Sequence, residues 1–352
     1  MIHADERFNL VTDWVTRELR LTPRLIEPAS SDASFRRYFR IFHDGGTHII
    51  MDAPPEREDV RPYLNITVML ETAGVHVPRV YEWDVGRGLL LLEDLGTRQY
   101  LPTLLDGRDV DQLYQDALRA LAVIQVRGRE SAFELPAYDR EVLVREMALM
   151  PEWFCARHLG LELTREHGEM ITAAFEFLVA EALAQPQVFV HRDYHSRNLM
   201  ITTERNPGII DFQDALRGPV GYDLASLLKD CYIGWPRARV THWVERYRAQ
   251  LLAAGGAVGA DDAQFLRWFD LIGVQRHIKV LGIFARLWYR DGKSGYLNDL
   301  PLTLRYVLEA SAHFPQLRPL REFLVQHVVP ALPGANAREA QKISAGTACA
   351  GA

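Results

Sequence analysis

The sequence predicts an α+β protein of two lobes: a small N-terminal lobe with an antiparallel β-sheet and one helix, and a larger, mainly helical C-terminal lobe. Three observations support this fold class. The chain has 352 residues, more than a single hydrophobic core usually holds. Short apolar runs divided by turns occupy residues 24–93, and no convincing strand follows until residue 188. Helical spacing of apolar residues fills most of the remainder.

The N-terminal lobe, predicted over residues 1–93, is expected to begin with an amphipathic helix. Within residues 5–20, Val11, Trp14 and Val15 recur at helical spacing. Strands and one further helix follow: strands at 25–26, 38–42 and 48–51, a helix at 57–73, and strands at 80–83 and 88–92. The turn at residues 44–46 is typical of a hairpin, since it is rich in glycine.

The C-terminal lobe, predicted over residues 94–332, is expected to be mainly helical. Candidate helices lie near 109–126, 140–149, 163–185, 221–231, 239–254, 263–290, 299–313 and 317–328. The boundary between the lobes is placed at residues 93–96. Residues 333–352 are small, polar and rich in alanine, so we expect a disordered tail there.

A histidine, two aspartates and an asparagine at characteristic spacing form the most informative motif of the chain. His191 and Asp193, with Asn198 five residues on, are followed thirteen residues later by Asp211 and Phe212. This pattern is typical of phosphoryl-transfer enzymes with a protein-kinase-like fold. A core histidine with two loop-capping residues is the alternative interpretation. The apolar run that delivers Asp211 at the expected distance favours the functional one.

Each residue type in this motif has a chemical role. A carboxylate at Asp193 can accept the proton of an attacking hydroxyl. An amide oxygen and a second carboxylate, from Asn198 and Asp211, are the ligands that Mg²⁺ prefers. We expect His191 to brace the loop backbone. The motif therefore predicts a catalytic base, a magnesium pair and a bound nucleoside triphosphate such as ATP.

The N-terminal lobe lacks the lysine that usually binds the nucleotide phosphates. Only four of the 40 basic residues are lysine, and none precedes Lys229. The matching position is Met51, so an arginine must take the role or it is absent. Candidates for nucleotide binding are Ser31, Ala33 and Ser34 through their backbone, Arg36, Arg37 and Arg40 through guanidinium groups, and Glu93 and Leu95 at the hinge. A plain polar turn explains residues 30–37 almost as well.

Composition limits the remaining functions. The net charge of −6 argues against a nucleic-acid partner, and no apolar run approaches the length of a membrane span. Three cysteines at unrelated spacings suit a reducing cytoplasm. The expected partners are ATP and a small-molecule substrate, with a monomer favoured.

Longer phrases resemble a known family. The motif residues Asp193, Asn198 and Asp211 resemble the aminoglycoside phosphotransferase superfamily. The phrases at residues 31–40, 51–55, 151–154 and 275–293 are similar to bacterial anomeric kinases of N-acetylmuramic acid and N-acetylglucosamine. The resemblance spans roughly residues 8–330. It implies ATP- and Mg²⁺-dependent transfer to the anomeric hydroxyl of an amino sugar, giving the α-1-phosphate during peptidoglycan recycling. Methionine also stands at the Met51 position in that family.

Candidate substrate residues follow from the lactyl carboxylate of N-acetylmuramic acid, which needs a cationic or N–H partner. They are His195 and Arg197 in the catalytic loop, Arg276 and Lys279 on a later helix, and Glu146 as a hydrogen-bond acceptor. Residues 276, 279, 283, 286 and 290 share one helix face. A solvated charged face explains that spacing as well as sugar binding does.

Two alternatives remain open. The same fold could act on another acceptor, such as an aminoglycoside or choline, although a cationic acceptor would favour an acidic cleft rather than this arginine-rich loop. The missing lysine could instead indicate a nucleotide-binding pseudokinase, which the intact motif opposes.

Overall fold

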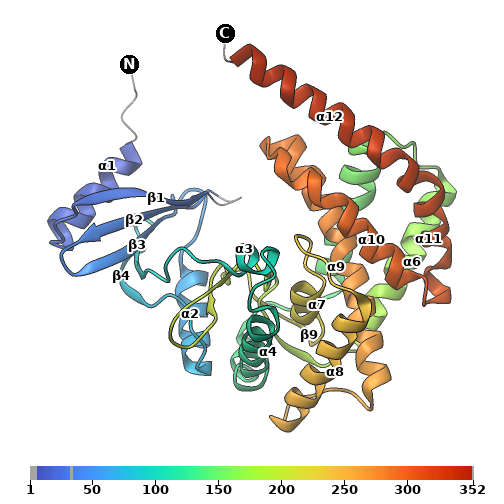
Figure 1. Ribbon diagram of the computed structural model, residues 1–352, viewed down its shortest axis with the longest axis horizontal. Helices are drawn as coiled ribbons and strands as arrows, with labels where there is room; N and C mark the ends of the chain where they lie inside the picture. The colour runs from blue at the N-terminus through green and yellow to red at the C-terminus, as the bar shows by residue number, and fades with distance from the viewer. Residues whose placement is uncertain (1–5, 32–34, 351–352) are drawn as a thin grey trace. The chain divides into compact units, whose positions relative to one another are not determined.

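The protein is described by a computed structural model that covers residues 6–31 and 35–350 (Figure 1). The chain forms two compact units. The first unit is Met1–Ile124 with Arg197–Asp214, and the second is Gln125–Ser196 with Ala215–Ala352. The bilobal α+β class predicted from the sequence is confirmed, with a five-stranded antiparallel sheet in the first unit and a mainly helical second unit.

The first unit is built on a sheet whose strand order is β1-β2-β3-β5-β4. The strands are β1 (Leu25–Ser31), β2 (Arg37–His43), β3 (Gly46–Asp52), β4 (Val80–Asp84) and β5 (Leu89–Glu93), and every neighbouring pair is antiparallel. All five were predicted. Each of the residues Leu89–Leu92 of β5 is buried, as expected for a strand covered on both faces.

Helices cover this sheet. The first helical segment is α1 (Glu6–Asp13) with its π-helical continuation η1 (Trp14–Glu18), and it packs Val11, Trp14 and Val15 against Ile41 and Ile50. This confirms the predicted amphipathic helix. Helix α2 (Arg61–Ala73) ends at Gly74, whose φ of 92° suits glycine because a Cβ disfavours the left-handed region.

The first unit also includes a segment from much later in the chain. Hairpin β7 (Leu199–Met200) and β8 (Gly208–Ile209) forms bridges from Met200 to Gln99 and from Gly208 to His76. Helices α3 (Tyr100–Leu105) and most of α4 (Val110–Arg127) complete the unit. The unit therefore contains residues 97–124 and 197–214 in addition to those before the predicted boundary at 93–96.

The second unit is organised around one long helix, α9 (Asp262–Asp291). Its side chains are buried almost all round between Phe265 and Leu287, which is typical of a central helix. Gly282 allows a close approach, since a Cβ there would lie 2.3 Å from the carbonyl carbon of Leu149. This contact brings α9 against the end of α5 (Arg140–Met147) and the π-helical segment η3 (Met150–His158).

The other elements of the second unit surround α9 (Figure 1). They are η2 (Ser131–Glu134), α6 (Arg165–Leu183), hairpin strands β6 (Gln187–Val190) and β9 (Leu216–Pro219), α7 (Tyr222–Leu228), α8 (Arg237–Ala253), η4 (Ser294–Asp299), α10 (Leu300–Ser311), η5 (Pro315–Leu317), α11 (Arg318–Phe323) and η6 (Leu324–Val328). All predicted helices of this region are present. Residues 94–186, which the structure describes throughout, contain no strand, as predicted.

The C-terminal segment differs from its prediction. Residues 333–352 were expected to be disordered, but α12 (Val329–Ala350) is a helix. Leu332, Ala335 and Glu339 of this helix are buried, and the Glu339 carboxylate accepts a hydrogen bond of 2.9 Å from Trp288 Nε1. The prediction was wrong because alanine-rich composition suits disorder and also has the highest helix propensity, and sequence alone does not show the packing partner.

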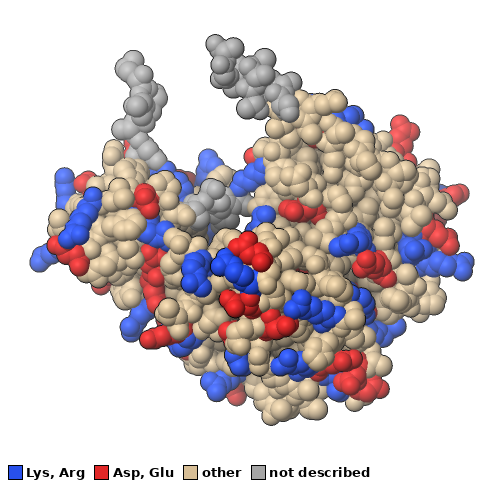
Figure 2. Space-filling model, in the orientation of Figure 1, with Lys and Arg blue, Asp and Glu red and all other residues tan. Residues whose placement is uncertain are grey.

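Surface properties fit the composition. On the face that Figure 2 shows, Lys and Arg side chains are interspersed with Asp and Glu side chains. In the described part of the chain, none of the helices has the length and apolarity needed to cross a membrane.

Candidate active site

The loop that carries the predicted base follows strand β6 in the second unit. His191 Nδ1 accepts a hydrogen bond of 3.3 Å from the backbone N–H of Asp193, so His191 braces the loop as predicted. The Asp223 carboxylate, in the first turn of α7, accepts from the N–H groups of His191 at 2.7 Å and Arg192 at 3.0 Å. These bonds hold Arg192 at a φ of 78°, a left-handed conformation that costs about 1–3 kcal/mol for a residue with a Cβ.

Burial dominates the electrostatics of Asp223. It raises the pKa of this carboxyl to about 7, although the two backbone N–H donors oppose the rise. Asp223 therefore supports the loop and also titrates near neutral pH.

Asp193, the predicted base, lies partly buried among cationic side chains. Burial alone would raise its pKa, but the nearby charges of Lys279, His195 and Arg192 outweigh that effect and hold the pKa below the usual value. Asp193 is therefore ionised at neutral pH. Of the predicted substrate residues, the structure brings Lys279, His195 and Arg276 into electrostatic range of this carboxylate.

Glu146 and Lys279, predicted as substrate residues, lie together in a buried network of charges. Lys279 Nζ lies 3.1 Å from Glu146 Oε1 and donates to Tyr222 Oη at 3.1 Å. Arg192 and the Tyr138 hydroxyl also donate to the Glu146 carboxylate. Burial opposes ionisation of Glu146, but the charges of Lys279 and Arg192 lower its pKa overall. We call Glu146, Lys279, Arg192 and Tyr138 the Glu146 network.

The remaining substrate candidates have different surroundings. Arg276 is 4% exposed, and its Nη1 lies 3.5 Å from Cys231 Sγ. The His195 ring makes an edge contact with Tyr232, with centroids 5.5 Å apart. Arg197 belongs to the first unit, where its carbonyl accepts from Gln99 Nε2 at 2.8 Å. Substrate binding by the five candidates stays a prediction; they are Glu146, His195, Arg197, Arg276 and Lys279.

A solvated face is excluded for Arg276 and Lys279 of α9, although Arg290 of the same face is 54% exposed. A solvated face would expose its charges, but Arg276 and Lys279 are only 4% and 6% exposed. Buried cations require compensating anions, which the Glu146 carboxylate supplies for Lys279. The two cations are therefore part of the internal structure around Asp193.

The predicted metal pair lies in the first unit, on either side of the β7–β8 hairpin. Asp211 follows buried β8 with a φ of 65°, and Asn198 Nδ2 lies 3.2 Å from its Oδ2. Gln213 Nε2 donates to Asp211 Oδ1 at 2.8 Å. Phe212 packs against Tyr63 of α2, with ring centroids 4.8 Å apart, and this contact anchors the segment.

The donor set at Asp211 fits Mg²⁺. A half-turn of the Asn198 amide would present its oxygen, and the carboxylate supplies a second hard ligand. In residues 6–31 and 35–350, no group of three or more His, Cys, Asp or Glu side chains is placed to hold a metal ion. A pair such as this suits Mg²⁺ because that ion keeps waters and shares its other positions with phosphate oxygens.

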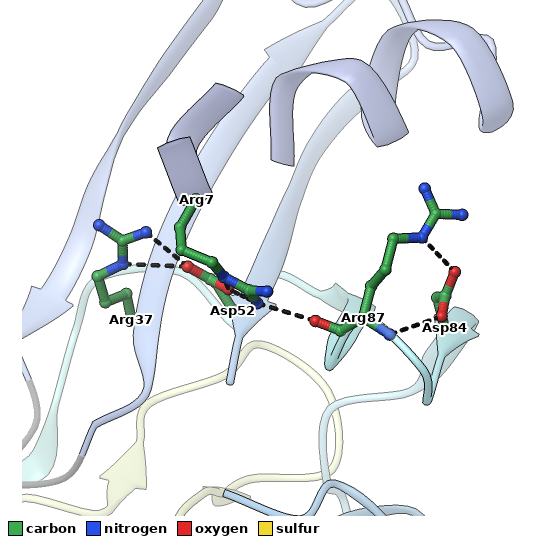
Figure 3. A network of polar contacts seen from close by, with 5 residues as sticks. All are labelled: Arg7, Arg37, Asp52, Asp84 and Arg87. Atoms are coloured by element: carbon green, nitrogen blue, oxygen red, sulfur yellow. Dashed lines mark hydrogen bonds and ion pairs between the residues drawn. The ribbon is translucent and has the colours of Figure 1, made fainter. Parts of the chain in front are cut away.

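Two of the predicted nucleotide-binding arginines pair with carboxylates, and Figure 3 shows the first pair, Arg37 with Asp52. Arg37 donates from Nε at 3.0 Å and from Nη2 at 2.7 Å to Asp52, which Arg7 also contacts. Arg40 forms a two-bond pair with Asp94, at 2.7 and 3.0 Å. Both arginines therefore have a structural role in the sheet, and their contact with a nucleotide stays a prediction.

The contacts of the other predicted nucleotide-binding residues say less about a nucleotide site. Ala33 and Ser34 lie outside the described residues, and Ser31 ends β1. The Glu93 carboxylate accepts from the backbone N–H of Arg79 at 3.2 Å. Leu95 is half-buried, with its Cδ1 beside Gly208. Their role at a hinge also stays a prediction.

Several residues that matter here were not among the candidates that the sequence suggested. Gln213 and Arg192 occupy positions that the motif leaves variable. Asp230 accepts hydrogen bonds from both the N–H and the hydroxyl of Ser196, which fixes the end of the base loop. The partners of Arg192 and Asp230 lie 46 and 34 residues away, so the local sequence gave no signal for these two residues.

Comparison with known proteins agrees with this arrangement. The profile of the phosphotransferase enzyme family APH matches residues 25–268, a segment that includes Asp193, Asn198 and Asp211. The chain belongs to this family. It is therefore an ATP-dependent phosphotransferase with a hydroxyl acceptor.

Curated relatives are similar over nearly the whole chain. A protein of Pseudomonas aeruginosa named N-acetylmuramate/N-acetylglucosamine kinase is 46% identical over 91% of this chain and 96% of its own length. A protein of Neisseria meningitidis with the same name is 44% identical over 85% of this chain and 90% of its own. The resemblance predicted from the sequence is confirmed at this level.

Solved structures confirm the fold. An ethanolamine kinase of Plasmodium vivax matches with a TM-score of 0.61 and 12% identity, over 87% of this chain and 90% of that one. The ADP-bound aminoglycoside phosphotransferase APH(2″)-Ib matches with a TM-score of 0.55 and 14% identity, over 87% and 98%. At such identities the likeness concerns the fold alone.

Proposed function

We propose that this chain transfers the γ-phosphoryl group of ATP to the anomeric hydroxyl of N-acetylmuramic acid or N-acetylglucosamine, giving the α-1-phosphate in peptidoglycan recycling. The observation that carries the proposal is Asp193, a carboxylate kept ionised by Lys279, His195 and Arg192 within a phosphotransferase fold. The acceptor follows from the relatives at 44–46% identity, whose printed name is that of an amino-sugar kinase.

Asp193 acts on the proton of the acceptor. As the anomeric oxygen attacks the γ-phosphorus, the carboxylate accepts the hydroxyl proton and the bond to ADP breaks. A hemiacetal hydroxyl is more acidic than an ordinary alcohol, so a carboxylate of lowered pKa is a sufficient base. The Asp223 bonds and the His191 brace keep the loop in position, which favours alignment of the reactants.

Asn198 and Asp211 would hold the metal that accompanies the nucleotide. Mg²⁺ bound there neutralises charge on the phosphate groups. A cytoplasmic location is part of the proposal, and the use of ATP and the buried free cysteines Cys155 and Cys231 support it.

The cationic surroundings of Asp193 favour an anionic or neutral acceptor. Lys279, Arg276 and Arg192 would repel the positive groups of an aminoglycoside or of choline. The pseudokinase alternative is not favoured, because family membership and the paired Asn198 and Asp211 go together with an intact base.

The test is a panel of acceptors incubated with the full chain, ATP and Mg²⁺. N-acetylmuramic acid and N-acetylglucosamine should give a sugar phosphate whose ³¹P NMR signal couples to the anomeric proton. The methyl glycoside of N-acetylglucosamine, which has no free anomeric hydroxyl, serves as the matched control and should give none. Phosphorylation of the methyl glycoside, or of choline or kanamycin in preference to the free sugars, would overturn the proposal.

A further inference from the structure

The chain has no lysine before Lys229, so arginines of the first unit are the candidates for a cation that contacts the nucleotide phosphates. Three arginines, Arg36, Arg37 and Arg40, lie at and just before strand β2. Each of the three pairs with a different carboxylate, and the identity of that carboxylate indicates which arginine could bind phosphate.

Arg37 and Arg40 each form an ion pair with a buried carboxylate. Asp52, the partner of Arg37, is 0% exposed, and the Asp94 side chain, the partner of Arg40, is 5% exposed. Arg40 also donates to the Gly96 carbonyl at 3.0 Å. Moving either guanidinium to a ligand would leave a buried carboxylate without its counter-charge, which is costly.

Arg36 lies beside the metal carboxylate instead. Its Nη2 lies 3.6 Å from Asp211 Oδ1, which is an ion-pair distance longer than a hydrogen bond. The Arg36 side chain is 10% exposed, and the Asp211 side chain is 31% exposed. The charges of Arg36 and Asp211 both affect the pKa of the buried Tyr63 of α2, whose ring packs against Phe212, so these groups lie in one region of the first unit.

We propose that Arg36 binds the β- and γ-phosphates of ATP and supplies the charge of the missing lysine. Phosphate oxygens that shared a Mg²⁺ with Asp211 would lie about 3–4 Å from its carboxylate, because octahedral Mg²⁺ holds each oxygen at about 2.1 Å. The Arg36 guanidinium already lies at that range. Its planar fork can donate two N–H groups to phosphate oxygens, which a lysine cannot do in the same geometry.

This assignment adds a residue role to the proposed function. It depends on that function for one point, that the nucleotide is ATP. A purely structural ion pair is the competing explanation. In that case Arg36 offsets the charge of Asp211, and its removal would leave ATP affinity unchanged or would raise Mg²⁺ affinity.

The experiment measures dissociation constants of ATP and AMP by isothermal titration calorimetry, with Mg²⁺ and without any acceptor. Arg36→Met should weaken ATP binding about 10- to 100-fold, the loss expected for a charge-assisted pair of bonds, and leave AMP within about twofold. Arg24→Met is the matched control, because Arg24 is 73% exposed and pairs with Asp44 in the same unit. It should leave both constants unchanged.

Arg36→Gln provides a second variant, in case the methionine variant does not fold, and thermal unfolding by circular dichroism checks both. Unchanged ATP affinity in a folded variant, or equal losses for ATP and AMP, would overturn the assignment of Arg36. Since no acceptor is present, a failed sugar panel with an intact Arg36 effect would reject the sugar assignment alone.

Discussion

Asp193 and Asp211 come from one sequence motif, yet their surroundings in the two units differ. Around Asp193, the neighbouring charges Lys279 and Arg276 are buried and tied to other buried groups. The contacts of Asp211 include two amides and the Arg36 guanidinium, and its side chain is 31% exposed. The base is therefore tuned by a network that the fold fixes, while the metal carboxylate is left with contacts that a ligand can replace.

The largest expected effect comes from the base itself. Asp193→Asn keeps the shape of the side chain but removes the proton acceptor, so the turnover number should fall about 10²- to 10⁴-fold. Steady-state kinetics with N-acetylglucosamine and ATP measure this. Normal turnover by a folded variant would remove Asp193 from the mechanism.

The Glu146 network should be the next most sensitive feature. Glu146→Gln removes the carboxylate that pairs with both Lys279 and Arg192, so we expect a loss of about 3–5 kcal/mol in the free energy of unfolding. Urea unfolding followed by fluorescence measures it.

The matched control for this variant is Glu141→Gln on the same helix. Glu141 pairs with Arg145 at 3.7 Å, and both side chains are mostly exposed, at 86% and 65%. This change should cost at most about 1 kcal/mol. Equal losses for the two variants would show that the Glu146 network does not stabilise the second unit.

A third effect concerns the pH dependence of the free energy of unfolding. Burial raises the pKa of Asp223 to about 7, so the folded state holds a proton that the unfolded chain has already released. This contribution is present at pH 4 and is lost as the pH rises towards 7, by up to about 1.4 kcal/mol per pH unit. Asp223→Asn cannot ionise, so its stability should fall less steeply over this range.

The difference between the two pH profiles isolates Asp223, since other groups titrate in both proteins. Burial also lowers the pKa of His277 to about 3, which makes stability rise with pH in the wild type and the variant alike. Parallel profiles between pH 4 and 7 would contradict the raised pKa of Asp223.

The sequence predicted the elements and the motif because both depend on local patterns. Alternating and helical spacing located the five strands of the sheet, and the spacing from His191 to Asp211 identified the site residues. Strand β9 was missed because its residues, Leu216–Pro219, include a glycine and a proline that are untypical of strands.

What the sequence did not reveal depends on long-range pairing. The bonds from Arg192 to Glu146 and from Arg7 to Asp52 join residues 46 and 45 positions apart. Nothing in the local pattern distinguishes Arg36 from Arg37, since they are neighbours of the same type, and only the fold gives them different carboxylates.

The central claim is that the two aspartates do separate jobs, one on the acceptor proton and one on the metal that accompanies the nucleotide. Calorimetric titration of ATP into Asp193→Asn and Asp211→Asn, each with Mg²⁺ and with EDTA, tests it most directly. We predict that Asp193→Asn keeps wild-type ATP affinity and its dependence on Mg²⁺, and that Asp211→Asn loses the dependence. Retained Mg²⁺ dependence in Asp211→Asn, or its loss in Asp193→Asn, would contradict this division of roles.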